Sequence, residues 1–304
     1  MESSLCNLQS PDAAYQRSAL EGLREAYPFL TVRPLGSSLC GRPITLLKIG
    51  QDTDERGGVL FAGAFHGIEW LTGLVLLRFV DRLCRAISTK QTLAGIHPGR
   101  ALEGRSLSVL PFVNPDGVEI ALHGAEAGFP FGDLILRACN RDPRLWKANA
   151  RGVDINHNFD AGWTQLREME KKKGIDGPAP TQYGGPAPES EPETKLLTAL
   201  CRQENFRHVL AYHSQGEEIY WHYGENNPQN AFLMGRILAV ASGYSLSMPS
   251  GLASHGGFKD WFIDEFHRPG FTVEIGKGQN PLPLSDLDRI YKRLEEMMML
   301  ATIM

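Results

Sequence analysis

Short apolar runs alternate with longer amphipathic segments along this chain, and the alternation predicts an α/β fold. Six runs have strand length and are rich in Val, Ile, Leu and Phe, at residues 30–33, 44–49, 58–64, 107–113, 209–212 and 270–275. Segments with helical spacing of apolar residues accompany them, at 11–27, 69–87, 190–200, 228–242, 257–266 and 286–304. We therefore expect one domain over residues 1–304, a mixed β-sheet flanked by helices on both faces, with residues 1–29 as a helical segment packed on it.

Local signals refine this prediction. The first two strands are separated by glycine-rich turns and should form a hairpin. Asn114-Pro-Asp-Gly117 is typical of a turn that closes the strand before it. Ser190 is the expected N-cap of the helix that follows, with Pro192 in the first turn. Residues 119–190 are rich in Gly, Pro and charge and show little periodicity, so we expect a long, functional loop region there.

Composition excludes several classes of function. Of the 304 residues, 42% are hydrophobic and 22% are charged, as in globular proteins with a buried core. The formal net charge of −4 and the lack of a basic cluster argue against nucleic acid and membranes as partners. The first ten residues lack the basic and apolar regions of a signal peptide. Five scattered cysteines, Cys6 among them, fit free thiols, so we expect a cytoplasmic protein.

Four polar residues follow the ends of predicted strands, where open α/β sheets carry their chemistry. His66 and Glu69 come after the strand at 58–64, His213 after the strand at 209–212, and Glu274 near the end of the strand at 270–275. Each residue alone would also fit a polar strand end that faces water. Two imidazoles and one carboxylate can hold zinc and leave a position for water, as in hydrolytic sites. Glu274 would then be a base beside the metal.

Short motifs run in order along the chain between about residues 40 and 280: His66-x-x-Glu69, Asn114-Pro-Asp-Gly117, Gly152-Val-Asp-Ile-Asn-x-Asn-Phe159, Ser190-Glu-Pro-Glu-Thr194, His213 and Thr272-Val-Glu274. Together they resemble the zinc metallocarboxypeptidases of carboxypeptidase A type. Two further segments, 146–154 and 255–261, are most similar to bacterial γ-D-glutamyl-diaminopimelate peptidases, which act on cell-wall peptides. The resemblance implies a carboxypeptidase-like fold and one zinc ion per chain.

Carried over by position, the resemblance also implies a metal site. His66, Glu69 and His213 would hold the zinc ion. Asp154 would bind the far ring nitrogen of His66 and fix its orientation. The alternative is that Asp154 is a turn residue that caps local backbone.

The same resemblance implies the catalytic groups. Glu274 would take a proton from a water held at the zinc and pass it to the leaving amine. Lys147 falls where the family has an arginine that stabilises the oxyanion. A lysine supplies the charge without the bidentate fork, and Arg151, one short turn away, is the alternative.

Departures from the family pattern concern the substrate. The family's carboxylate-binding arginines and lid tyrosine fall at Ile68, His157 and Leu252, so a C-terminal carboxylate held by bidentate arginine is not expected. His157, next to the expected substrate contact Asn156, would be either a pH-dependent anion contact or a solvated loop residue. Lys259 falls near the floor of the family's specificity pocket and would suit an acidic group, such as the side-chain carboxylate of diaminopimelate.

We therefore predict a zinc peptidase that cleaves small muropeptide-like peptides, at the bond between γ-D-glutamate and a diamino acid. The alternatives are a general carboxypeptidase that removes C-terminal residues, an N-acyl amino acid acylase, and a peptide-binding pseudoenzyme. Loss of a ligand or of Glu274 would mark the pseudoenzyme, and the sequence retains all four residues.

Overall fold

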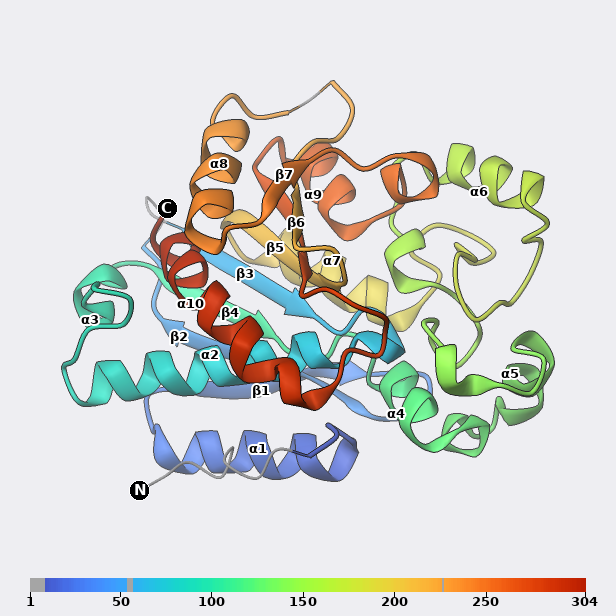
Figure 1. Ribbon diagram of the computed structural model, residues 1–304, viewed down its shortest axis with the longest axis horizontal. Helices are drawn as coiled ribbons and strands as arrows, with labels where there is room; N and C mark the ends of the chain where they lie inside the picture. Colours follow the sequence, from blue (N-terminus) through green and yellow to red (C-terminus); the bar gives the residue numbers. More distant parts are fainter. Residues whose placement is uncertain (1–8, 54–56, 226) are drawn as a thin grey trace.

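The computed structural model describes residues 9–53, 57–225 and 227–304, in which one eight-stranded mixed sheet lies between helices (Figure 1). The strands are β1 (Thr31–Ser37), β2 (Pro43–Gly50), β3 (Gly58–Gly63), β4 (Ser106–Leu110), β5 (Phe206–Ser214), β6 (Glu218–Tyr220), β7 (Ser245–Ser247) and β8 (Gly270–Ile275). The α-helices are α1 (Ala13–Ala26), α2 (Leu71–Ser88), α3 (Pro98–Ala101), α4 (Pro115–His123), α5 (Gly132–Ala138), α6 (Trp163–Lys172), α7 (Pro192–Gln203), α8 (Ala231–Ser242), α9 (Phe258–Phe266) and α10 (Leu287–Ile303).

The centre of the sheet is parallel, and this determines where polar strand ends meet. The strand order is β1-β2-β4-β3-β5-β8-β6-β7. β3 is parallel to β4 and β5, and β5 is parallel to β8, whereas β1 and β2 form the expected antiparallel hairpin. β3 is buried along its whole length, as expected of a parallel strand covered on both faces. The carboxyl ends of β3, β5 and β8 meet at one edge of the sheet.

Buried apolar residues form one layer on each face of the sheet, between the strands and the helices. One face packs against α1, α2, α8 and α10, and the other packs against α7 and α9 (Figure 1). Successive residues of β3 alternate between the layers, with Phe61 in the first and Leu60 in the second. The predicted α/β class, with helices on both faces of a mixed sheet, is confirmed.

The segment Asn114–Gly117 is not the predicted turn but the start of helix α4. The Asn114 side chain accepts a hydrogen bond from Gly117 N at 2.8 Å, and Pro115 occupies the first helical position. Asn and Pro favour both turns and helix starts, so the local sequence could not separate the two. At α7, Glu191 rather than the predicted Ser190 is the N-cap residue, while Pro192 is in the first turn as predicted.

Residues 119–190 contain more regular structure than the sequence indicated. Most of α4, all of α5 and all of α6 lie there. In α6 most side chains are polar and few are buried, so an apolar period is hardly visible. Two other differences concern strands. The strand predicted at 107–113 ends at Leu110, before Pro111. The strands β6 and β7, of three residues each, were not predicted.

The described part of the chain contains no helix long and apolar enough to span a membrane. Within the same part, the thiols of Cys40, Cys84, Cys139 and Cys201 are free, as predicted. Cys6 and the rest of residues 1–8 lie outside the described residues.

Candidate metal centre

Two neighbouring strand ends bring the first candidate residues together. His66 and Glu69 lie in the turn between β3 and α2, where residues 67–69 form a short 3-10 segment. Gly67 lets this turn pack closely on α4, because a Cβ there would lie 2.2 Å from the carbonyl oxygen of Gly117. His213 lies near the end of β5, the parallel neighbour of β3. The fold therefore places both imidazoles at the same edge of the sheet.

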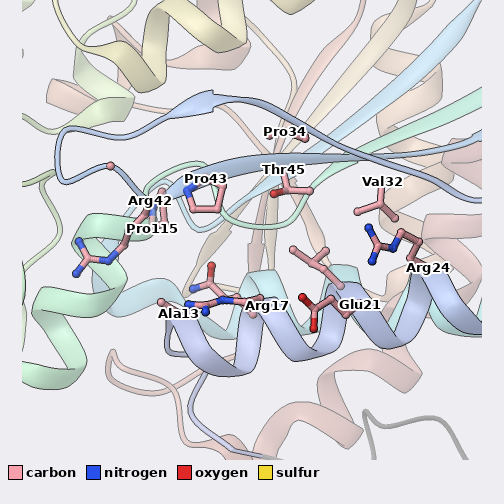
Figure 2. A pocket seen from close by; sticks show the side chains of 13 residues that line it. Ala13, Arg17, Glu21, Arg24, Val32, Pro34, Arg42, Pro43, Thr45 and Pro115 are labelled. Carbon is pink, nitrogen blue, oxygen red and sulfur yellow. The ribbon is translucent and has the colours of Figure 1, made fainter.

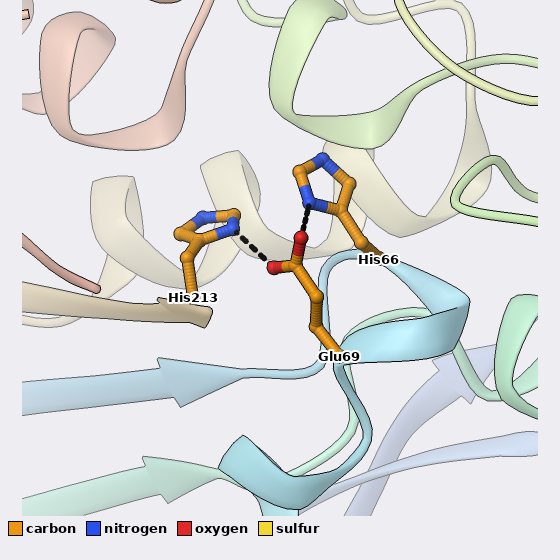
Figure 3. Close-up of side chains that lie close together, drawn as sticks. All are labelled: His66, Glu69 and His213. Atoms are coloured by element: carbon orange, nitrogen blue, oxygen red, sulfur yellow. Dashed lines mark hydrogen bonds and ion pairs between the residues drawn. The ribbon is translucent and has the colours of Figure 1, made fainter. Parts of the chain in front are cut away.

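The side chains of His66, Glu69 and His213 converge, with ligand atoms all within 4.8 Å of one another. The Glu69 carboxylate stands between the two rings (Figure 3). Its Oε1 lies 3.0 Å from His66 Nδ1, and its Oε2 lies 3.1 Å from His213 Nδ1. Phe65 stacks on the His213 ring with centroids 4.9 Å apart, which fixes the plane of that ring.

The Nδ1 atom of His66 is buried and faces the Glu69 carboxylate. Its Nε2 donates to Asp154 Oδ1 at 2.9 Å, which leaves Nδ1, facing Glu69, as the nitrogen available to a metal ion. Asp154 is itself held by Gln182 N, 2.8 Å from its Oδ2. Within the described residues, His66 Nδ1 is buried and makes no well-aligned hydrogen bond, although Glu69 Oε1 lies 3.0 Å from it. Two imidazole nitrogens and a carboxylate, with one nitrogen unsatisfied, fit a zinc ion with an open position.

The surrounding positive charges keep the Glu69 carboxyl group ionised. Burial alone would raise the pKa of Glu69, but His66, Lys147 and His213 together hold it well below its usual range. Burial lowers the pKa of His213. Burial also opposes protonation of His66, yet Glu69 and Asp154 raise the pKa of that ring to about 10. A proton and a metal ion therefore compete for His66, and metal binding should release protons.

Glu274 lies beside this group, on the strand next to His213. The register of β5 and β8 pairs His213 directly with Glu274, so both side chains leave the same face of the sheet. Burial and the nearby Glu69 raise the pKa of Glu274 to about 8. Part of the Glu274 side chain stays exposed. A carboxyl group that stands beside the three converging side chains and is open to water has the position expected of a general base.

Comparison with known proteins identifies the family. Residues 17–297 match the family model described as zinc carboxypeptidase. The chain belongs to the zinc carboxypeptidase family. As the motifs predicted, it is a metallopeptidase of the zinc-dependent type.

Relatives and solved structures agree with this assignment. γ-D-Glutamyl-L-diamino acid endopeptidase 1 of Lysinibacillus sphaericus is 35% identical over 286 residues, which cover 93% of this chain and 70% of that protein. Carboxypeptidase B of Homo sapiens is 26% identical over 264 residues, covering 79% and 56% of the two chains. The crystal structure of carboxypeptidase A from Helicoverpa armigera aligns with a TM-score of 0.72 at 20% identity, over 99% of this chain and 75% of that one. At that identity the structural likeness supports the fold alone.

In this zinc carboxypeptidase, the two candidate oxyanion residues have different surroundings. Lys147 Nζ donates to Glu69 Oε1 at 2.7 Å, beside the metal group. The Arg151 guanidinium instead pairs with the buried carboxylate of Glu191, with Nη2 3.0 Å from both oxygens. The geometry therefore brings Lys147 to the ligands and holds Arg151 at Glu191.

Two predicted substrate residues take part in contacts within the protein. Asn156 Oδ1 accepts a hydrogen bond from Phe258 N at 3.0 Å, at the start of α9. His157 is buried, and its Nδ1 lies 2.8 Å from Glu170 Oε1. The interpretation of His157 as a solvated loop residue is therefore wrong: its ring is buried because α6 provides a carboxylate partner for it.

Lys259 is also buried, with 3% of its surface exposed. Its Nζ pairs with Asp260 and donates to the carbonyl of His222 at 2.8 Å. The Tyr223 ring lies 5.8 Å from the same nitrogen. His222 and Tyr223 in turn line a cavity of about 450 Å³, together with His255 and others. Lys259 thus lies next to a cavity, but its charge is compensated by Asp260.

Two further contacts near the ligands had no signal in the sequence. Ser214 N donates to Glu69 Oε2 at 3.2 Å. Asn280 makes two hydrogen bonds to Ser214: its Oδ1 accepts from Ser214 Oγ at 2.8 Å, and its Nδ2 donates to the Ser214 carbonyl at 2.7 Å. The only clue to Asn280 is its position a few residues after Glu274. These bonds hold the segment that follows His213.

A separate groove of about 390 Å³ lies between α1 and the strands β1 and β2 (Figure 2). Arg17, Glu21 and Arg24 line it on the helix side, and Val32, Pro34 and Pro43 line it on the strand side. Its lining contains none of the candidate ligands or catalytic residues, so it is distinct from the metal centre.

Proposed function

We propose that this zinc carboxypeptidase hydrolyses small muropeptide-like peptides, at the bond between a γ-D-glutamyl residue and a diamino acid such as meso-diaminopimelate. The relative of Lysinibacillus sphaericus, whose name states this class of bond, is 35% identical over most of the chain. The proposal transfers that specificity to the present protein.

The observation that carries the proposal is the chemistry at the positions of the family's carboxylate clamp. Ile68 and Leu252 are buried apolar residues, each 4% exposed. His157 is engaged by Glu170. None of the three offers the planar, bidentate guanidinium that grips a terminal carboxylate. A peptidase without this clamp has little reason to prefer ordinary C-terminal residues, which favours a specialised peptide over a general carboxypeptidase substrate.

We assign the chemistry to the following residues. His66, Glu69 and His213 would hold a zinc ion, whose Lewis acidity would polarise the scissile carbonyl. Glu274 takes a proton from the attacking water and returns it to the leaving amine.

Lys147 and Lys259 complete the assignment. Lys147 contributes positive charge where negative charge develops on the carbonyl oxygen. We favour it over Arg151 because Arg151 is held by Glu191. Lys259, beside the cavity lined by His222 and Tyr223, would receive an acidic group of the substrate in exchange for part of its contact with Asp260.

Product analysis by mass spectrometry tests the proposal. The protein is incubated with zinc and, in separate reactions, with a defined γ-D-glutamyl-diaminopimelyl peptide, an ordinary α-linked peptide with a hydrophobic C-terminus, and an N-acyl amino acid. We expect cleavage on the amino side of the diamino acid, which frees it from the γ-D-glutamyl residue, and slow or no turnover of the other two. Faster release of the ordinary C-terminal residue would favour a general carboxypeptidase, and faster deacylation would favour an acylase.

A further inference from the structure

Three titratable residues form a row across neighbouring strands at the edge of the sheet. The register pairs His213 of β5 with Glu274 of β8, and Glu274 with Glu218 of β6. Residues directly opposite each other share one face of a sheet, so Glu218 extends the row one strand beyond Glu274. A Cβ at Gly216 would lie 3.5 Å from Glu274 Cβ and 3.6 Å from Glu218 Cγ, which confirms that the two acidic side chains are neighbours.

A like-charge pair at directly opposite positions breaks a general rule of sheet stability. Two carboxylates there repel each other, and such local violations in stable folds are expected at functional sites. The adjacent residue Glu217 has cationic partners, with Arg293 Nη1 2.7 Å and Lys277 Nζ 3.3 Å from its carboxylate. In the described ranges, Glu218 has no ion pair with a lysine or arginine. Among these residues, Glu218 therefore lacks the kind of cationic partner that its neighbour Glu217 has.

Glu218 is accessible and has a neutral polar neighbour on its own strand. Tyr220 lies two residues along the strand, on the same face, and burial followed by the Glu218 carboxylate raises the pKa of its hydroxyl. Both side chains are partly exposed. Neighbouring strands are about 5 Å apart, so Glu218 lies roughly one strand spacing from Glu274. An ammonium group on a flexible four-carbon side chain can span that distance from a residue cleaved beside Glu274.

We propose that Glu218 determines specificity by binding the side-chain ammonium group of the substrate's diamino acid, with the Tyr220 hydroxyl beside it. This inference rests on the proposed function and names the residue that would distinguish a diamino acid from a residue without the second amine. The ammonium group neutralises Glu218 while it is bound.

Two matched peptides test the inference. Both contain γ-D-glutamate, linked to L-lysine in one and to L-norleucine in the other, so they differ in the side-chain amine. We expect the wild-type protein to prefer the lysine peptide. In Glu218→Gln, kcat/KM for the lysine peptide should fall about ten- to a hundred-fold, as for loss of one charge-assisted contact. For the norleucine peptide it should change by less than about three-fold, because no charged contact is lost.

Two further variants keep the test decisive. Glu126→Gln makes the same charge change at an exposed residue outside the row and should leave both peptides unaffected. Tyr220→Phe should also lower kcat/KM for the lysine peptide, but by a smaller factor than Glu218→Gln. If Glu218→Gln does not fold or does not hold zinc, Tyr220→Phe provides the test instead.

The outcomes separate the inference from the proposed function. Equal losses on both peptides would show that Glu218 acts on Glu274 rather than on the substrate, and would overturn the inference. An unchanged preference for lysine in both variants would overturn it as well. If the wild-type protein cleaves neither γ-D-glutamyl peptide but does cleave an α-linked peptide, the proposed function fails, and the inference fails with it.

Discussion

Asp154 Oδ1 lies 2.9 Å from His66 Nε2, on the side of the ring opposite the nitrogen that faces Glu69. This contact fixes the tautomer in which Nδ1 is free to bind a cation. Asp154→Asn keeps the shape but removes the negative charge and one acceptor. We expect zinc affinity to fall by about ten- to a hundred-fold, measured by competition with a chromophoric chelator.

A matched control separates this effect from a general change in the loop. Asp160→Asn alters an exposed aspartate six residues further along and should bind zinc as tightly as the wild-type protein. Wild-type zinc affinity in Asp154→Asn would mean that Asp154 only caps the local turn, where it also accepts a hydrogen bond from Asn156 N.

Glu274→Gln separates proton transfer from metal binding. The amide keeps the size of the side chain but cannot take a proton, so kcat should fall by about 10²-fold or more. Zinc content and thermal stability should stay close to wild-type values, because Glu274 is not one of the three converging ligands. Activity within a few-fold of wild type would exclude Glu274 as the base.

Lys147 and Arg151 can be distinguished by which property each substitution changes. Lys147→Met removes positive charge beside Glu69, and we expect kcat to fall by about 10²-fold, with a smaller change in KM. Arg151→Met leaves the buried Glu191 without its cation, so the free energy of unfolding should fall by about 1–3 kcal/mol while kcat changes little. Steady-state kinetics and urea unfolding of both variants check this. The reverse pattern would assign the oxyanion role to Arg151.

The burial of His208 should make the free energy of unfolding depend on pH in the acid range. Burial, and secondarily Arg207, lower the pKa of His208 to about 3, and its Nε2 donates to Ala301 O at 2.7 Å. In the unfolded chain the ring titrates near its usual value of about 6.5. The unfolded state therefore binds the proton first, and stability is lost as the pH falls from about 6.5 towards 3, by at most about 1.4 kcal/mol per pH unit.

Replacing His208 should flatten that slope. His208→Gln retains a donor for Ala301 O but does not titrate, so its free energy of unfolding should fall less than that of the wild-type protein between pH 7 and pH 5. Urea unfolding of both proteins, with chelator present to remove metal effects, measures the difference. Parallel slopes would show that His208 does not titrate in this way.

The metal group could be predicted from the sequence because its members follow apolar strands. Long buried parallel strands are visible as apolar runs, and His66, His213 and Glu274 lie at their ends. The motifs around them are short and local. When the fold places these parallel strands side by side, the residues at their carboxyl ends come together.

The supporting residues could not be predicted in the same way. Glu191 bonds to Arg151, 40 positions away, and Asn280 bonds to Ser214, 66 positions away. Glu218 lies in a three-residue strand without a detectable period. Charged side chains are usually exposed, so the burial of Lys259 depends on Asp260 and His222 O, which only the folded chain brings to it.

Zinc stoichiometry tests the central claim, that His66, Glu69 and His213 form the metal centre. Protein reconstituted with zinc and freed of excess metal should contain close to one zinc ion per chain, measured by inductively coupled plasma mass spectrometry. His213→Ala removes one of three ligands, so most of that zinc should be lost under the same conditions while the fold, checked by circular dichroism, is retained. Full retention of zinc in His213→Ala would contradict the account.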